Sequence, residues 1–393
     1  MRRLIRGRGQ ERGAVAVIVA LVVGMFVLTG VAALAIDAGS LYNQRRVVQN
    51  GADAASLALA QICAKNLADP LCPANTDLVN TAALKTYLTG LAAANATSDA
   101  PSIFEICGGG TDGQKFGVCA GGSALTDCSI VLPSWLPADA NWVQVKTRTF
   151  VPRVFSGLAN NAFTGKTVQA CARAAWGPLS SEVIKLPFTI STCEFTHATG
   201  VTLPATDAQI NAGTYGVETA LAFDYKVNPT PAACASFNGH DFPGGFGWTD
   251  RQPDCTAATL VGGWLGSQTP ESNGIGGGNG CAAQLFSYVG KDVNLPIFDC
   301  VNDDKIFCPA VHSTSSTWYH LATFAFFHIT ALDVTGTVRD LTPPPSAAAR
   351  AYCNLVSKDN KCIYGYFKAG ISSDGTMGDT GTSGLTKVVL VAG

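Results

Sequence analysis

The residue types that could support chemistry are histidines, clustered acids and a glycine-rich loop. His320 and His328 are separated by an even number of positions, so they would share one face of a strand. No acidic residue shares that spacing, and a zinc site needs three or four ligands. We therefore expect all five histidines to be satisfied or solvated rather than metal ligands: His197, His240, His312, His320 and His328.

Two further patterns suggest ligand binding only superficially. Residues 274–280 read GIGGGNG, but they lack the Gly-Lys-Ser/Thr ending of a phosphate-binding loop and follow no clear strand. Asp299, Asp303 and Asp304 bracket Cys300 and could bind calcium, although calcium needs six to eight oxygen ligands in a defined loop. No Gly-x-Ser-x-Gly nucleophile motif is present. We expect a surface loop and solvated acids here, and we predict no catalytic, cofactor or metal site and no enzymatic activity.

Cysteine chemistry is the stronger signal. The chain has 14 cysteines, with no Cys-x-x-Cys motif and none beside a histidine at zinc spacing. We predict up to seven structural disulfides (14 cysteines in pairs), with free buried cysteines as the alternative, and local closures of Cys63 with Cys72 and of Cys353 with Cys362. The candidates are Cys63, Cys72, Cys107, Cys119, Cys128, Cys171, Cys193, Cys234, Cys255, Cys281, Cys300, Cys308, Cys353 and Cys362.

The uncharged stretch at residues 14–36 determines on which side of a membrane the rest of the chain would lie. Its 23 residues, AVAVIVALVVGMFVLTGVAALAI, exceed the roughly 20 apolar residues that cross a bilayer. Arginines precede the stretch and Asp37 follows it, so we expect the N-terminus to be cytoplasmic and residues 37–393 to be extracytoplasmic. The alternative is a cleaved secretory signal, because Ala33-Leu34-Ala35 resembles a cleavage site, although the stretch is long for a signal.

Small and apolar residues mark two helical faces. Ala16, Ala20 and Gly24 recur every four residues, which predicts either association with another spanning helix or a plain lipid-facing helix. Beyond the span, one apolar stripe favours a continuing exterior helix that docks other elements. Its members are Leu41, Val48, Ala52, Ala55, Leu59 and Ile62. Arg45 and Arg46, just outside the span, would be either solvated or in contact with lipid phosphates.

Residues 12–60 resemble the N-terminal segment of the TadE/TadG-like proteins of Flp (tight-adherence) pilus assembly. The resemblance rests on Arg12-Gly13 before the span, Asp37-x-Gly39 after it, and then Leu41, Arg45, Gln49, residues 52–55 (ADAA), Leu57 and Ala58. Ile18 stands where TadE- and TadF-like pseudopilins carry a glutamate, which favours the TadG-like branch. No Asp-x-Ser-x-Ser motif occurs, so the resemblance implies no von Willebrand A domain here.

The rest of the chain reads as short strands separated by glycine and proline. We expect a helix near residues 77–91, strands at 142–151 and 167–176, and a central buried strand at 317–332. Further strands are expected at 183–190, 218–227, 362–369 and 386–392, and no helical period is evident after residue 180. The predicted segments are a cytoplasmic basic tail (1–13), a transmembrane helix (14–36), an exterior helix (37–68), a small α/β domain with two strands (69–180) and a cysteine-containing β-rich domain (181–393).

These expectations define an α+β protein with one N-terminal transmembrane helix, a long exterior helix and a β-rich, disulfide-stapled extracytoplasmic region. A net charge of −2 argues against nucleic acid as a partner. The resemblance implies a structural or assembly component of a Flp (Tad) type pilus or related surface secretion apparatus, single-pass in the cell membrane. Its expected partners are the lipid bilayer and other pilus-assembly or pseudopilin-like membrane proteins. The alternative is a secreted hydrolase or ligand-binding protein whose apolar segment is a cleaved signal.

Overall fold

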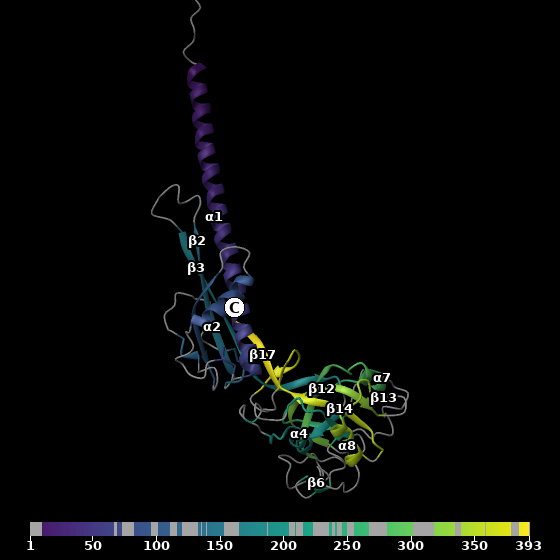
Figure 1. Ribbon diagram of the computed structural model, residues 1–393. Helices are drawn as coiled ribbons and strands as arrows, with labels where there is room; N and C mark the ends of the chain where they lie inside the picture. The colour runs from purple at the N-terminus through teal and green to yellow at the C-terminus, as the bar shows by residue number, and fades with distance from the viewer. Residues whose placement is uncertain are drawn as a thin grey trace, which may run out of the picture.

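One long helix and two large β-sheets make up the computed structural model (Figure 1). The helix projects as a rod, and the sheets lie beside and beyond its C-terminal half. The structure describes residues 10–66, 69–72, 82–95, 101–110, 116–119, 133–134, 136–138, 140–152, 165–186, 188–203, 209, 215–222, 236–237, 240–241, 246–249, 255–266, 281–301, 318–334, 339–357, 359–378 and 385–392.

Helix α1 (Gln10–Lys65) runs without a break through the apolar segment and the exterior helix. Its 56 residues correspond to about 84 Å at 1.5 Å per residue. The range contains no proline and is rich in alanine and leucine, which are strong helix formers. The helix confirms the predicted continuous rod and ends at Lys65, shortly before the predicted boundary at residue 68.

The first sheet packs against the C-terminal half of α1. Val143 and Val145 of one strand and Ala174 and Trp176 of the next form a core with Leu59 of the helix. The strands, in sheet order, are β1 (Ser102–Gly109), β2 (Asn141–Pro152), β3 (Gly165–Ile184), β17 (Leu385–Ala392) and β15 (Gly370–Ser372), and β16 (Thr376–Met377) and β9 (Ala257–Leu260) also pair with β3.

Helix α2 (Ala82–Ala94) crosses α1 at Gly51. A Cβ atom at Gly51 would lie 3.0 Å from Pro101 Cγ and 3.2 Å from Ala92 Cβ. Glycine therefore admits a close approach that a larger residue would obstruct, which explains a residue that is otherwise unfavourable inside a helix. The expected helix near 77–91 is thus present from Ala82, and residues 77–81 lie outside the described part of the chain.

The sheet corrects the expected division of the chain at residue 180. The two strands predicted at 142–151 and 167–176 are β2 and β3, but β1 extends the sheet on one side and β17 extends it on the other. Strand β3 runs through residue 180 without interruption, and β17 pairs antiparallel with it, Val388 opposite Trp176. Pairing between strands that are distant in sequence leaves no local signal, because any apolar strand of suitable length could occupy that edge.

The second sheet is built around β12 (Trp318–Asp333), which confirms the central strand expected at 317–332. β12 lies between two antiparallel neighbours, and its own Phe327 is fully buried. The sheet order is β5 (Thr219–Ala222), β14 (Cys362–Lys368), β12, β11 (Asp292–Val301), β4 (Phe188–Ser191) and β8 (Phe246–Trp248), with β10 (Trp264–Gly266) and β13 (Arg339–Asp340) also on β12. A separate pair is formed by β6 (Ser236–Phe237) and β7 (His240–Asp241).

The described part of the chain contains three short helices after residue 180, where no helical period is evident in the sequence. They are α4 (Thr192–Thr199), α7 (Cys281–Phe286) and α8 (Ala347–Val356). Ser191 and Ser346 cap α4 and α8 by accepting a hydrogen bond from a backbone N–H of the first turn, and Gly200 ends α4 in the left-handed conformation. In α8, Ala349, Cys353 and Val356 form a buried apolar face at helical spacing, but the face covers only ten residues and gives a weak signal in sequence.

Disulfides close three short segments of the described chain. Cys63 bonds to Cys72 and Cys353 to Cys362, which confirms both predicted local closures. A third bond joins Cys107 to Cys119. Four further cysteines are also disulfide-bonded, namely Cys171, Cys193, Cys255 and Cys300. The chain therefore has the stapled character expected of a protein outside the reducing cytosol.

Candidate membrane anchor and assembly site

The N-terminal half of α1 is an uncovered apolar rod. Its large apolar side chains from Val15 to Ile36 are between 46% and 75% exposed. In the described part of the chain, α1 is the one helix long and apolar enough to cross a membrane. An apolar surface of this extent in water would be costly, so a bilayer or another apolar partner must cover it.

The small-residue stripe lies on this uncovered rod. Ala16 and Ala20 are exposed and Gly24 is half-exposed. A Cβ atom built on Gly24 would meet nothing within 4 Å, so no described residue of this chain occupies the stripe. The stripe is sterically open to a second helix, which is what close packing in a membrane requires.

The apolar stripe beyond the span lies against the first sheet. Val48, Ala52, Ala55 and Leu59 are fully buried. Leu41 and Ile62, at the two ends of the stripe, are half-buried. The four central residues therefore attach the helix to this chain's own sheet, rather than to a separate subunit.

Two polar contacts fix the position of the helix along the sheet. The Thr147 hydroxyl donates a hydrogen bond to the Val48 carbonyl (2.9 Å), and Gln49 Nε2 donates one to the Cys171 carbonyl (2.8 Å). Gln49 Nε2 also bonds Asp53 Oδ1 at 2.9 Å. Sequence periodicity identified the apolar stripe but not these contacts, because they depend on which strand lies beneath the helix.

Replacing Thr147 with valine is expected to lower the free energy of unfolding by about 1 kcal/mol, because a buried hydroxyl loses its hydrogen bond while the side-chain shape is kept. The measurement is chemical denaturation of the full chain in detergent. Thr167→Val, at an exposed site on β3, is the matched control and should leave stability unchanged. Equal stability of the two variants would show that the Thr147 contact does not hold the helix.

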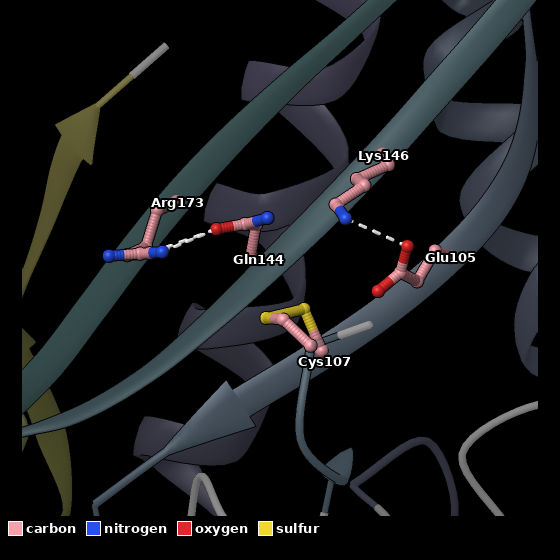
Figure 2. The surroundings of a disulfide bond; sticks show 6 residues. Glu105, Cys107, Gln144, Lys146 and Arg173 are labelled. Atoms are coloured by element: carbon pink, nitrogen blue, oxygen red, sulfur yellow. Dashed lines mark hydrogen bonds and ion pairs between the residues drawn. A yellow bond between two sulfur atoms is a disulfide. The ribbon is translucent and has the colours of Figure 1, made fainter. Parts of the chain in front are cut away.

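The face of the sheet away from α1 is polar yet buried (Figure 2). Lys146 Nζ lies 2.8 Å from Glu105 Oε2, and Arg173 donates two hydrogen bonds to Gln144 Oε1 while its guanidinium lies 4.3 Å from the Trp142 ring centre. The alternation of apolar and polar residues in β2 is typical of a half-buried strand with its polar face in water. The structure corrects that expectation, because the side chains of Gln144, Lys146 and Arg173 are 2–3% exposed.

This polar face offers no metal site. Glu105, Cys107 and Cys119 place potential ligand atoms within 4.8 Å of one another. The two sulfur atoms are joined in a disulfide, and the carboxylate is held by Lys146 (Figure 2). A disulfide supplies no thiolate, so the group lacks the ligands that a metal of this type would need.

The two histidines of β12 are each held by an acid from β11. His320 Nδ1 lies 2.7 Å from Asp299 Oδ1, and His328 Nδ1 lies 2.7 Å from Asp292 Oδ1. The sequence offered no acidic partner at strand spacing, but antiparallel pairing places Asp292 directly opposite His328. The histidines are thus satisfied, as expected. Residues 274–280, His312, Asp303 and Asp304 lie outside the described residues.

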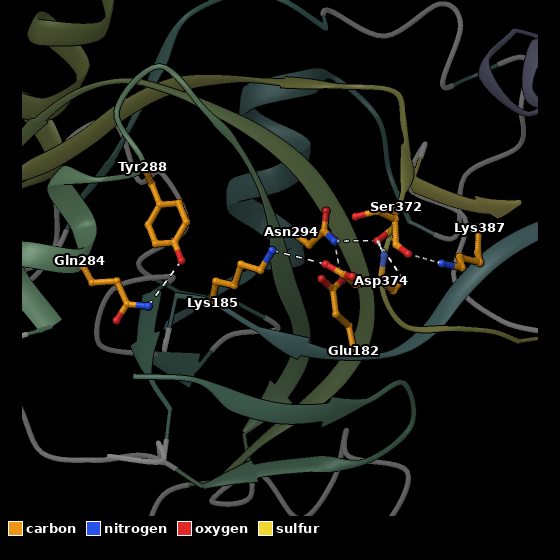
Figure 3. A network of polar contacts seen from close by, with 9 residues as sticks. Glu182, Lys185, Gln284, Tyr288, Asn294, Ser372, Asp374 and Lys387 are labelled. Carbon is orange, nitrogen blue, oxygen red and sulfur yellow. Dashed lines mark hydrogen bonds and ion pairs between the residues drawn. The ribbon is translucent and has the colours of Figure 1, made fainter. Parts of the chain in front are cut away.

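A polar network joins the first sheet to the second (Figure 3). Asn294 Nδ2 of β11 donates to Glu182 Oε2 of β3 (2.5 Å) and to Ser372 Oγ of β15 (3.0 Å). Lys185 pairs with Asp374 at 3.3 Å, and burial raises the pKa of Glu182. The same residues line a small cavity. The contacts link elements of both sheets, so their evident role is to hold the two sheets together.

Comparisons with known proteins bear on helix α1. Residues 13–61 match a family model described as "Putative Flp pilus-assembly TadE/G-like". Neither curated proteins nor solved structures give a match to this chain. The matched range begins just before the uncovered apolar rod and ends within the part of α1 that is buried against the sheet. Residues 13–61 of helix α1 are therefore similar to the segment that the TadE/G-like family model describes.

Proposed function

We propose that this chain is a membrane-anchored structural component in the assembly of a Flp-type pilus or a related surface secretion apparatus. The observation that carries the proposal is the coincidence of the TadE/G-like match, residues 13–61, with a helix that is half uncovered and half docked. The uncovered half would cross the bilayer. The docked half would hold the disulfide-bonded body close to the membrane.

Orientation and partners follow from the ends of the span. Five arginines lie within residues 1–13, and arginine next to a span is retained on the cytoplasmic side. The body would then be extracytoplasmic, where its disulfides persist. The open stripe of Ala16, Ala20 and Gly24 would pack against other spanning subunits of the apparatus.

The proposed role is structural rather than catalytic. Groups that could act as acids or bases are held in pairs, among them His320 with Asp299, His328 with Asp292 and Lys146 with Glu105. Such pairs fix side chains between strands. They favour a durable scaffold that presents surfaces to other subunits.

The double variant Val22→Asp, Phe26→Asp is expected to leave the membrane fraction and to abolish pilus assembly. Each acid near the middle of a span costs about 3 kcal/mol of insertion free energy, so two should prevent insertion. The measurement is alkaline extraction of membranes, with electron microscopy of surface filaments. The control, Val217→Asp with Leu260→Asp, places two acids at sites that are 57% exposed in the body, and should behave as wild type.

Two results would contradict the proposal. One is that the Val22→Asp, Phe26→Asp variant remains in extracted membranes and still supports filament assembly. The other is that amino-terminal sequencing of the wild-type extracytoplasmic form finds a start near Ile36. The second result would favour the secreted hydrolase or ligand-binding protein, since the apolar segment would then be a cleaved signal.

A further inference from the structure

The β2–β3 hairpin runs beside α1 toward the apolar rod (Figure 1). Val143 and Val145 lie in the core with Ala55 and Leu59, whereas Thr147 contacts Val48, so β2 runs antiparallel to the helix. The strands remain paired to their ends, where Pro152 lies opposite Gly165. The hairpin therefore points at the place where the helix would enter the bilayer.

The contact between Thr147 and Val48 gives a reference point for estimating how far the ends of β2 and β3 extend along the axis of α1. Five further residues of β2 advance about 17 Å at 3.3 Å per residue. The same distance along α1 corresponds to roughly 11 residues at 1.5 Å each, which leads from Val48 to Asp37. Asp37 is the first charged residue after the apolar stretch, so the paired strand ends lie at the expected edge of the bilayer.

Four exposed cations lie near this position along the axis of α1. We call them the basic collar: Arg45, Arg46, Arg148 and Lys166. By the same estimate they lie between about 5 and 15 Å from the end of the apolar stretch. Asp37, half-buried, is the carboxylate at this level among the described residues. The layer thus carries a surplus of positive charge, although the whole chain has a net charge of −2.

Exposed aromatic side chains accompany the basic collar. Tyr42 is 61% exposed and stacks with Arg46, whose guanidinium lies 4.9 Å from the ring centre. Phe150, near the end of β2, is 52% exposed. Aromatic and basic side chains together are typical of the membrane–water interface, where rings sit among headgroups and cations meet phosphates.

We propose that the basic collar and the paired ends of strands β2 and β3, at Pro152 and Gly165, form a second membrane contact, which binds anionic lipid headgroups. The inference rests on the proposed anchoring by residues 14–36 and adds a surface to it. The headgroup layer is about 5–8 Å thick on each side of the bilayer, and long arginine and lysine side chains extend across that distance. Contact at two points, the helix and the hairpin, would fix the tilt of the body relative to the membrane.

The test is hydrogen–deuterium exchange of the full chain in nanodiscs. One set contains phosphatidylcholine alone, and the other contains phosphatidylcholine mixed with phosphatidylglycerol. In the anionic discs at low salt, the ends of β2 and β3 should exchange on the order of 25-fold more slowly, because two cations near an anionic surface each contribute about fivefold. High salt should remove the difference, since it screens these charges.

Matched variants separate the basic collar from a general charge effect. Arg148→Gln with Lys166→Gln should abolish the slowing in anionic discs. Lys291→Gln with Lys361→Gln removes the same charge from the second sheet and should keep it. The salt dependence of the wild-type chain tests the same contact without any substitution.

The outcomes distinguish this contact from the anchor itself. Equal exchange of the hairpin in both discs, with residues 15–36 protected, would overturn the lipid contact and leave the anchoring intact. Unprotected residues 15–36 would overturn both. Slowing that appears only when another membrane protein is added, whatever the lipid, would assign the basic collar to a protein partner instead.

Discussion

Replacing Leu59 with alanine is expected to lower the free energy of unfolding by about 3 kcal/mol. Leu59 is fully buried between α1 and the first sheet, in a core with Val143, Val145 and Trp176. Truncation removes apolar contacts and leaves a cavity, because a helix held by Thr147 and Gln49 cannot move inward freely. The measurement is denaturation of the full chain in detergent, with tryptophan fluorescence as the signal that reports unfolding.

Leu260→Ala is the matched control for the leucine truncation. Leu260 lies on β9 of the same sheet and is 57% exposed. The same atoms are removed there without opening a cavity, so stability should change little. If the two variants were equally stable, the stripe on α1 would not be the attachment that holds the rod to the body.

Replacing Glu194 with glutamine is expected to remove a pH dependence of stability. Glu194 is 2% exposed, and burial raises its pKa from the ordinary 4.5 to about 8, an effect partly opposed by the hydrogen bond that the Tyr352 hydroxyl donates. Between those two pKa values the unfolded chain has lost the proton that the folded chain retains. Stability therefore falls as pH rises through this window, and it is highest below the unfolded pKa.

The window from pH 6.5 to pH 8 isolates this effect from that of the neighbouring His197. The His197 ring stacks on Tyr352 with centres 4.4 Å apart, and burial lowers its pKa below 6.5, so most of the change in its own contribution falls below this window. Wild type should lose roughly 2 kcal/mol across the window. Glu194→Gln should lose less and should be the more stable chain at pH 8.

The control for the glutamate is Asp359→Asn, which neutralises an exposed carboxylate. Its denaturation midpoint should follow pH as the wild type does. Parallel pH profiles of wild type and Glu194→Gln would contradict the assignment of a buried, protonated carboxyl at this position.

Long, periodic features of this chain could be predicted from its sequence. The apolar rod, its continuation as a helix and the stripe with Val48, Ala52 and Leu59 follow from runs of many residues that repeat one signal. The strand at 317–332 was evident for the same reason, since a buried central strand is apolar throughout. Cysteines nine residues apart, at Cys63 and Cys353 with their partners, gave the right local closures.

Features that depend on pairing at long range could not be predicted. The position of β17 beside β3, the acids opposite His320 and His328, and the burial of Lys146 all follow from which strands are neighbours. The basic collar belongs to the same class, because Arg46 and Lys166 are far apart in sequence. They lie at a similar position along the axis of α1 because β2 packs on the helix with Thr147 in contact with Val48.

Strand β17 also constrains how the protein can be made. It completes the sheet that holds α1, and the Thr386 hydroxyl even bonds the Ala64 carbonyl near the end of that helix. With the proposed cytoplasmic N-terminus, the body would be translocated in sequence order from residue 37. Its membrane-proximal unit would therefore wait for residues 385–392 to emerge before it could close. A chain without this strand would leave one edge of β3 unpaired, with exposed backbone N–H and C=O groups.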